Sequence, residues 1–204
     1  MPIVSEEHKN QRKKQILDSA LACFSQKGYD VATIDDIVKH SGISKGSIYN
    51  YFKSKEEIYI DLLEVSTKNI YDELTVQINK LHTAIDQMKF LFDYLIDQDP
   101  STELQKDYSL VKFEFQLSSS RNEELKEVLE NSLKDTKMKI IEGILSKGVI
   151  SGEFRKELNI EVYAEMFWSF VDGATLQNLL FPNYPYHELL KEQKSIFLKK
   201  VIKP

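Results

Sequence analysis

The sequence has few of the residues that interrupt helices or build covalent frameworks. Its 204 residues include only seven glycines and five prolines, and the Asn-Gly and Asp-Gly pairs that frequent hairpins need hardly appear. Cys23 is the single cysteine, which excludes an internal disulfide framework and favours a reducing compartment. With 42% hydrophobic and 29% charged residues, the composition indicates a globular and mainly helical chain.

Secretion and membrane signals are also missing. The N-terminal stretch MPIVSEEHKNQRKK becomes polar within a few residues and has no apolar h-region. The most apolar segment, residues 163–181, carries Glu165 and Asp172, and an acidic residue near the centre of a spanning helix costs roughly 3 kcal/mol. We therefore expect a buried helix there, no membrane partner and a cytoplasmic location.

The sequence lacks the motifs of common enzymes and metal sites. There is no G-x-S-x-G elbow, glycine-rich phosphate loop or Cys-x-x-Cys pair, and HELLK at 187–191 lacks the second histidine of a zinc-protease helix. Ser44, Ser47 and Tyr49 have no general base at a plausible spacing. The four histidines are scattered: His8, His40, His82 and His187. We expect no enzyme activity, no metal and no cofactor.

The charge is distributed unevenly along the chain. The net charge of −5 argues against a nucleic-acid partner only when the chain is taken as a whole. Residues 1–60 hold nine Lys/Arg and eight Asp/Glu, a balance of +1, whereas residues 61–204 hold eighteen and twenty-four, a balance of −6. The first sixty residues therefore carry a modest basic footprint.

Those sixty residues predict three helices in a helix-turn-helix arrangement. Apolar positions recur at helical spacing from Gln11 to Lys27. Thr33 opens a second helix as a capping box with Asp36, and Ser41-Gly42 ends it after about two turns. Ser44 is the expected N-cap of a third helix, whose inward residues are Ile48 and Phe52.

These residues carry a specific family resemblance. The run RKKQILDSALACFSQKGYDVATIDDIVKHSGISKGSIYNYFKSKEEIY, residues 12–59, closely resembles the DNA-binding domain of the tetracycline-repressor (TetR) family of bacterial transcriptional regulators. The resemblance implies a third helix that presents its N-terminal residues to base edges in the major groove, with flanking donors on phosphates. Lys45 suits guanine, Ser47 suits several bases, and Gly46 lets the backbone approach the DNA.

The predicted DNA-binding residues follow from this. Tyr49 and Tyr51 offer phenolic donors to phosphates, and Asn50 suits either adenine or the backbone. Thr33 and Ser44 are expected first as helix caps, with DNA contact in addition. The full set is Thr33, Ser44, Lys45, Gly46, Ser47, Tyr49, Asn50, Tyr51 and Lys55.

The rest of the chain predicts further helices. A helix of about 27 residues follows Ser54 and is long enough to connect two bodies. Others are expected at 83–98, 103–118, 122–150, 160–181 and 186–202. The predicted fold is therefore all-α, with a helix-turn-helix domain at 1–55 joined by a long helix to a helical effector-binding and dimerisation domain at 56–204.

The 160–181 segment is apolar on almost every side, so it must be covered on more than one. We expect one side to meet its own core and another to meet a second copy of the chain, together with the last helix. A two-fold dimer would space two reading helices for successive major grooves. The predicted dimer residues are Phe170, Ala174, Gln177, Phe181 and Phe197.

The middle helices contain more aromatic residues than a scaffold needs, with acidic residues among them. The resemblance implies an effector pocket for a small hydrophobic ligand, and whether that ligand is cationic stays open. Packing in an ordinary core is the alternative use of the same side chains. The candidate ligand-binding residues are Phe90, Tyr108, Phe113, Glu114, Phe115, Phe167, Trp168 and Asp172.

The sequence thus predicts a cytoplasmic, homodimeric transcriptional regulator that binds a double-stranded palindromic operator and is most simply a repressor released by a ligand. Two alternatives remain: an activator of the same fold, and a carrier that sequesters a small molecule without regulating genes. The stretch from Ser41 to Tyr59 separates the carrier from the regulators, because a carrier has no use for it.

Overall fold

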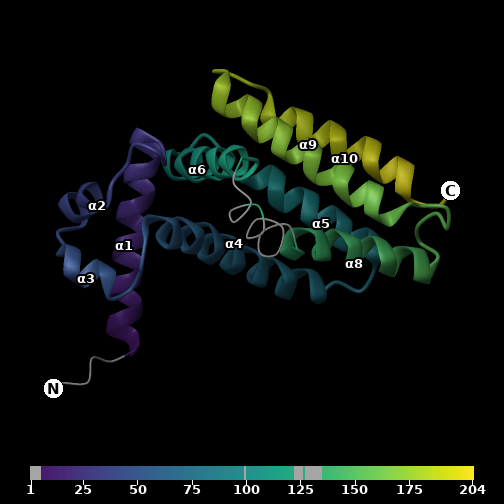
Figure 1. Ribbon diagram of the computed structural model, residues 1–204. Helices are drawn as coiled ribbons and strands as arrows, with labels where there is room; N and C mark the ends of the chain where they lie inside the picture. Colours follow the sequence, from purple (N-terminus) through teal and green to yellow (C-terminus); the bar gives the residue numbers. More distant parts are fainter. Residues whose placement is uncertain (1–5, 99, 122–125, 127–134) are drawn as a thin grey trace. The chain divides into compact units, whose positions relative to one another are not determined.

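The computed structural model describes residues 6–98, 100–121, 126 and 135–204. In these ranges the regular elements are helices, apart from an isolated β-bridge between Phe154 and Ile202. Figure 1 shows the helices α1 Glu6–Lys27, α2 Ile34–Ser41, α3 Lys45–Tyr49, α4 Lys55–Asn79, α5 Ala84–Asp97, α6 Glu103–Ser119, α8 Asp135–Ser151, α9 Ile160–Leu180 and α10 Tyr186–Val201. The predicted all-α fold is confirmed.

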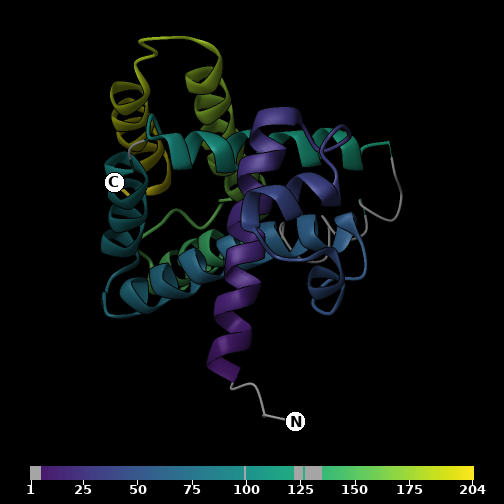
Figure 2. The same cartoon turned by 90° about the vertical axis from the view of Figure 1, so that its left-hand side faces the viewer.

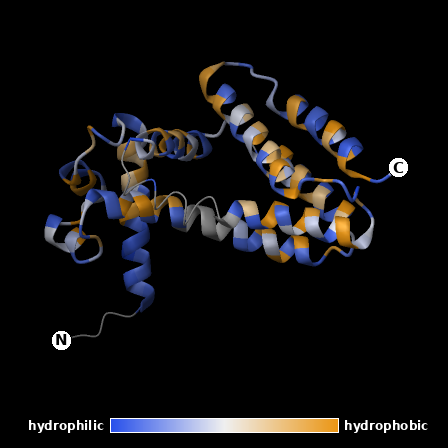
Figure 3. Cartoon of the chain, turned by 45° about the vertical axis from the view of Figure 1, so that its right-hand side comes forward, coloured by the Kyte–Doolittle hydropathy of each residue, from blue (hydrophilic) through white to orange (hydrophobic). Residues whose placement is uncertain are grey.

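The predicted helices agree with the observed ones to within a few residues, except at two places. α1 begins at Glu6, earlier than predicted, because acidic residues in its first turn suit the helix dipole and Glu6 pairs with Lys9 at 2.7 Å. This N-terminal half of α1 is hydrophilic, as the blue segment in Figure 3 shows. Of the helix predicted at 122–150, residues 122–125 and 127–134 lie outside the described residues, and α8 forms the rest.

The chain divides into two compact units. The first unit spans Met1–Ser66 and Asp107–Leu129, and the second unit spans Thr67–Lys106 and Glu130–Pro204. They differ from the two consecutive domains predicted, 1–55 and 56–204, because the start of α4 and most of α6 belong to the first unit. Two helices, α4 and α6, therefore contribute residues to both units.

The first unit has a small core formed by α1, α2, α3, the start of α4 and part of α6. α2 and α3 lie on the same side of α1 (Figures 1 and 2). Gln15 on α1 donates a hydrogen bond to the carbonyl of Ser41 at 3.0 Å, which ties α1 to the end of α2. The largest fully buried side chains of this core are Phe24, Phe52, Tyr59 and Phe115.

The second unit has a larger core between α5, α8, α9 and α10. α9 contributes one face to it, and Phe167 stands edge-on to Phe92 with ring centroids 4.9 Å apart. After α8, the chain turns at Gly152 and buries Phe154 completely against Gly148. None of the helices in the described ranges combines the length and the apolar run that a membrane span needs.

Candidate DNA-binding surface

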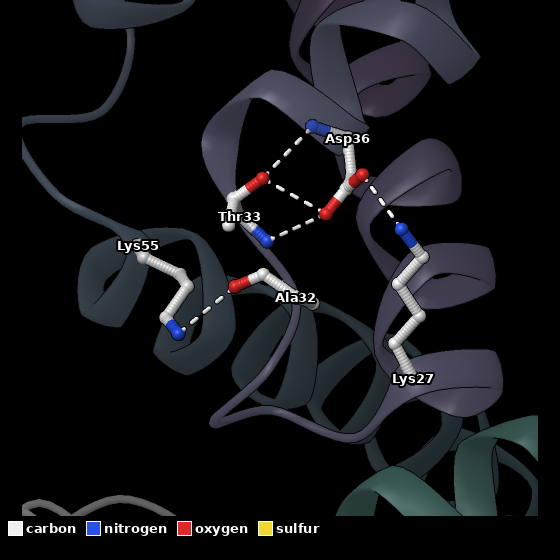
Figure 4. Close-up of polar contacts among 5 residues, drawn as sticks. All are labelled: Lys27, Ala32, Thr33, Asp36 and Lys55. Atoms are coloured by element: carbon white, nitrogen blue, oxygen red, sulfur yellow. Dashed lines mark hydrogen bonds and ion pairs between the residues drawn. The ribbon is translucent and has the colours of Figure 1, made fainter.

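The start of α2 is fixed by a closed set of polar contacts, shown in Figure 4. The Thr33 hydroxyl accepts from the Asp36 N–H at 3.2 Å, and the Asp36 carboxylate accepts from the Thr33 N–H at 3.0 Å. This is the predicted capping box. Lys27 adds an ion pair to Asp36 at 2.7 Å, and hydrogen bonds from Lys27 and then Thr33 lower the pKa of that carboxyl to about 2.

The turn between α2 and α3 follows from three successive residues. Gly42 has a left-handed backbone with φ of 68°, and its N–H donates to the Val38 carbonyl at 3.0 Å. Ile43 is buried and anchors the turn. Ser44 then caps α3 by accepting from the Ser47 N–H at 3.3 Å.

One side of α3 is anchored and the other is open. Ile48 and, just after the helix, Phe52 are almost completely buried in the first unit. Ser47 and Tyr51 are half-buried. Four of the residues from Lys45 to Phe52 are exposed, and we call them the α3 face: Lys45, Gly46, Tyr49 and Asn50.

Lys45 forms an ion pair with an acidic residue of α2 that its sequence pattern does not indicate. Its ammonium group lies 3.0 Å from the carboxylate of Asp35 on α2, and both side chains are more than half exposed. The hydrogen bond to Asp35 raises the pKa of Lys45, and like other lysines it carries a positive charge at neutral pH. Because exposed ion pairs are weak, Lys45 can leave Asp35 for a stronger anion.

Gly46 is not required by the packing of the first unit. A Cβ atom built on Gly46 has no neighbour within 4 Å, and its backbone is helical. Alanine would form this helix better than glycine does. The local fold therefore gives no reason for a glycine at this position, whereas the close approach of another backbone would.

Lys55, Thr33 and Ser44 are used within the first unit. Lys55 donates to the carbonyls of Tyr29 at 2.7 Å and Ala32 at 3.0 Å, and its ammonium group lies 4.3 Å from the centre of the Tyr29 ring. Figure 4 shows the contact with Ala32. Lys55 therefore holds α4 to the α1–α2 turn, and its contact with DNA stays a prediction. The Thr33 and Ser44 hydroxyls serve as caps.

The α1–α2 turn also forms hydrogen bonds with α4 and α6, which the sequence alone did not predict. The Tyr29 hydroxyl donates to Glu56 on α4 at 2.9 Å, and the Tyr29 N–H donates to Glu114 on α6 at 3.3 Å. The Tyr59 hydroxyl donates to the carbonyl of Val111 on α6 at 2.7 Å. Burial, reinforced by the hydrogen bond to Glu56, raises the pKa of Tyr29. These contacts fix the helix-turn-helix segment to α4 and α6.

The predicted ligand-binding residues fall into both units. Phe90, Phe167, Trp168 and Asp172 belong to the second unit, whereas Tyr108, Phe113, Glu114 and Phe115 belong to the first. Phe115 is completely buried beside Tyr59, with ring centroids 5.1 Å apart. Glu114 also borders a hollow of about 380 Å³ beside the α1–α2 turn. Their role in binding a ligand stays a prediction.

The predicted dimer residues are divided between the core and the surface of the second unit. Ala174 and Phe197 are buried in the protomer's own core. Phe170, Gln177 and Phe181 are exposed. They lie among other exposed apolar residues of α9 and its C-cap, which with Phe170 and Phe181 we call the α9 face: Val162, Met166, Leu176 and Leu180.

A capped helix, a glycine turn and a short second helix with an exposed polar face define a helix-turn-helix DNA-binding protein. The family model "Bacterial regulatory proteins, tetR family" matches residues 16–62, and the model "Tetracyclin repressor-like, C-terminal domain" matches residues 90–184. The chain belongs to the TetR family of bacterial transcriptional regulators.

Three relatives illustrate the similarity. The HTH-type transcriptional regulator YfiR of Bacillus subtilis is 30% identical, and the match covers 98% of this chain and 97% of YfiR. The negative regulator IcaR of the icaADBC biofilm operon in Staphylococcus aureus is 42% identical over 42% of this chain and 46% of IcaR. The crystal structure of Bacillus subtilis FadR in complex with stearoyl-CoA has a TM-score of 0.75 at 24% identity, covering 91% of this chain and 97% of FadR.

Proposed function

We propose that this regulator is a ligand-responsive repressor that binds a palindromic operator as a homodimer in the cytoplasm. The observation that carries the proposal is the α3 face, whose four residues are exposed while Ile48 and Phe52 hold the helix in the core. In this role Gly46 lets α3 approach the DNA backbone. Repression is supported by the relative IcaR, which is named as a negative regulator.

Each residue of the α3 face has a chemical task on DNA. Lys45 leaves Asp35 and donates to the O6 and N7 atoms of guanine. Asn50 pairs with adenine or with a phosphate, and Tyr49, 46% exposed, donates its hydroxyl to a phosphate. Ser47 and Tyr51 are half-buried at the edge of this face and add donors there.

Dimerisation is supported by the α9 face. Met166, Phe170 and Leu180 are each exposed by more than a third, although the opposite side of α9 is packed in the core. A row of apolar side chains on one helix is better covered by a partner than left in water. A two-fold dimer places two α3 helices about 34–36 Å apart, so each half of a palindrome meets one of them.

The effector acts on DNA binding from the second unit, which contains the C-terminal family match. The FadR complex supports a hydrophobic ligand, because that protein of the same fold holds stearoyl-CoA. α4 and α6 have residues in both units, so a ligand that shifts either helix changes the spacing of the two α3 helices. A lower affinity for the operator follows.

The test is a gel-shift selection with fragments of the genome that encodes the chain. The bound fragments are expected to share a palindrome, and the stoichiometry is expected to be two chains per site or a multiple of two. Stearoyl-CoA, with free coenzyme A as the control, should release the DNA if the effector resembles that of FadR. Binding without sequence preference would contradict the proposed function.

A further inference from the structure

One ion pair of the second unit lies among aromatic rings. The Lys137 ammonium group on α8 is 2.9 Å from the Asp172 carboxylate on α9, and the two side chains are only 17% and 23% exposed. The same ammonium group lies 5.3 Å from the centre of the Trp168 ring. Another ion pair of this unit, between Lys194 and Asp93, has a carboxylate that is 54% exposed.

The Trp168 ring beside this ion pair is held in a fixed orientation. The Trp168 indole N–H donates to the Lys137 carbonyl at 3.1 Å, which fixes the orientation of the ring. Tyr71 on α4 stands edge-on to Trp168, with ring centroids 6.0 Å apart. Burial raises the pKa of Tyr71, and the charge of Asp172 raises it further, so the phenol stays neutral. The ion pair is thus flanked by two oriented rings.

The fold has little need of this charge pair. Taking two charges out of water is costly, and a well-packed apolar pair of similar size is often as stable or more stable. α8 and α9 already contact each other through buried apolar residues such as Ile141, Leu145 and Trp168. A carboxylate beside the face of a tryptophan is, however, the combination that binds an ammonium ion well.

We propose that Asp172, Trp168 and Tyr71 form a binding site for organic ammonium compounds, and that Lys137 is the cation that occupies it until a ligand arrives. The ligand's ammonium group replaces that of Lys137 beside Asp172. Lys137 can withdraw because its long stem allows the ammonium group to reach water. The inference rests on the proposed function only in assigning effector binding to the second unit.

Removal of the Lys137 charge should change the affinity for a ligand in a direction that depends on the ligand's charge. If Lys137 competes with the ligand, removal of its charge strengthens the binding of a cation. If Lys137 instead holds an anionic ligand, such as a carboxylate or a phosphate, the same removal weakens the binding of that anion. A purely structural ion pair gives no ligand-dependent effect of either sign.

The experiment uses Trp168, which is the only tryptophan of the chain and lies in the proposed site. Its fluorescence is titrated in the full-length protein with decyltrimethylammonium, and with decanoate as a probe of equal chain length and opposite charge. The variants are Lys137→Met and Asp172→Asn, with Lys194→Met as the matched control because it breaks the more exposed ion pair. Thermal unfolding establishes that each variant is folded.

We expect Lys137→Met to bind decyltrimethylammonium about tenfold more tightly and Asp172→Asn to bind it at least about tenfold more weakly. The double variant, which removes both charges of the pair, should also bind it weakly. Lys194→Met should behave as the wild type does. An unchanged or weaker affinity in Lys137→Met would overturn the proposal, as would saturable binding of decanoate that Lys137→Met abolishes. The titration contains no DNA, so its failure is separate from a failure of operator binding.

Discussion

Gly46 in the first unit and Gly148 in the second unit are both helical glycines, but only one is explained by its surroundings. A Cβ atom on Gly148 would lie 2.1 Å from the Phe154 ring, whereas a Cβ atom on Gly46 has nothing within 4 Å. The core of the second unit therefore requires a glycine at position 148. At Gly46 the packing of the protomer sets no such requirement, and a role of this glycine in the approach to DNA stays a prediction.

The charged residues of the two units differ in a similar way. Lys45 and Asp35 pair on an open surface, where water and other anions compete for them. Lys137 and Asp172 pair in a partly closed setting between helices. The first pair is suited to exchange with a large polyanion, and the second is suited to exchange with a small ligand.

The largest expected effect is on stability, in Gly148→Ala. The added methyl group collides with the completely buried Phe154, so overpacking should lower the free energy of unfolding by about 1–3 kcal/mol. Chemical denaturation followed by circular dichroism measures the loss. A variant as stable as the wild type would show that Phe154 can move aside. It would contradict the claim that the core requires glycine at position 148.

Gly46→Ala should leave the stability of the fold intact and weaken the binding of DNA. The folded protein should be as stable as the wild type or more stable by up to about 1 kcal/mol, because alanine favours the helix. Its affinity for the operator should fall by about tenfold, equivalent to roughly 1.4 kcal/mol, because the methyl group holds α3 away from the DNA. Fluorescence anisotropy with labelled operator provides the measurement. An unchanged affinity would contradict the claim that Gly46 allows α3 to approach the DNA closely.

The substitution Asp35→Asn tests whether the exposed ion pair with Lys45 limits DNA binding. Without its carboxylate partner, Lys45 is free for DNA and one like charge is removed from the surface, so binding to non-specific DNA should strengthen by a few fold. The matched control is Asp30→Asn, which removes an exposed carboxylate at the α1–α2 turn. If both substitutions act equally, the effect is one of net charge alone and not of the pair with Lys45.

Local features of the site could be predicted from the sequence, and long-range ones could not. The Thr33–Asp36 box and the Gly42 turn depend on residues only a few positions apart, so their pattern is visible in the chain. The charge of Lys55 is visible in the sequence, but the carbonyl groups that accept its hydrogen bonds lie 23 to 26 residues earlier. Glu114 and Tyr29 are 85 residues apart in the sequence, so no local pattern predicts the hydrogen bond between them.

The same limit applies in the second unit. The apolar character of residues 160–181 predicts a helix that is covered on more than one side, but it does not predict which side faces the protomer's own core. Ala174 and Phe197, which are predicted in the dimer interface, are buried in that core, and their contact with a partner stays a prediction. Small and aromatic residues suit both settings, so only the packing of α9 against α10 decides between them.

The smallest expected effect concerns the pH dependence of the first unit. The pKa of Asp36 is lowered from 3.8 to about 2 in the folded state, so its contribution to stability is present above pH 3.8 and is lost as the pH falls toward 2. Asp36→Asn should therefore show a smaller decrease in denaturation midpoint between pH 5 and pH 3 than the wild type. Lys27→Met, which removes the main cause, should act in the same direction. Equal decreases in all three proteins would contradict this role.

The most direct test of the account is the discrimination of Lys45→Ala between the selected operator and a scrambled duplex of the same length. We expect this variant to fold as the wild type does but to lose about tenfold or more of its preference for the operator. An unchanged preference, together with an unchanged affinity and salt dependence, would show that the α3 face does not read the DNA.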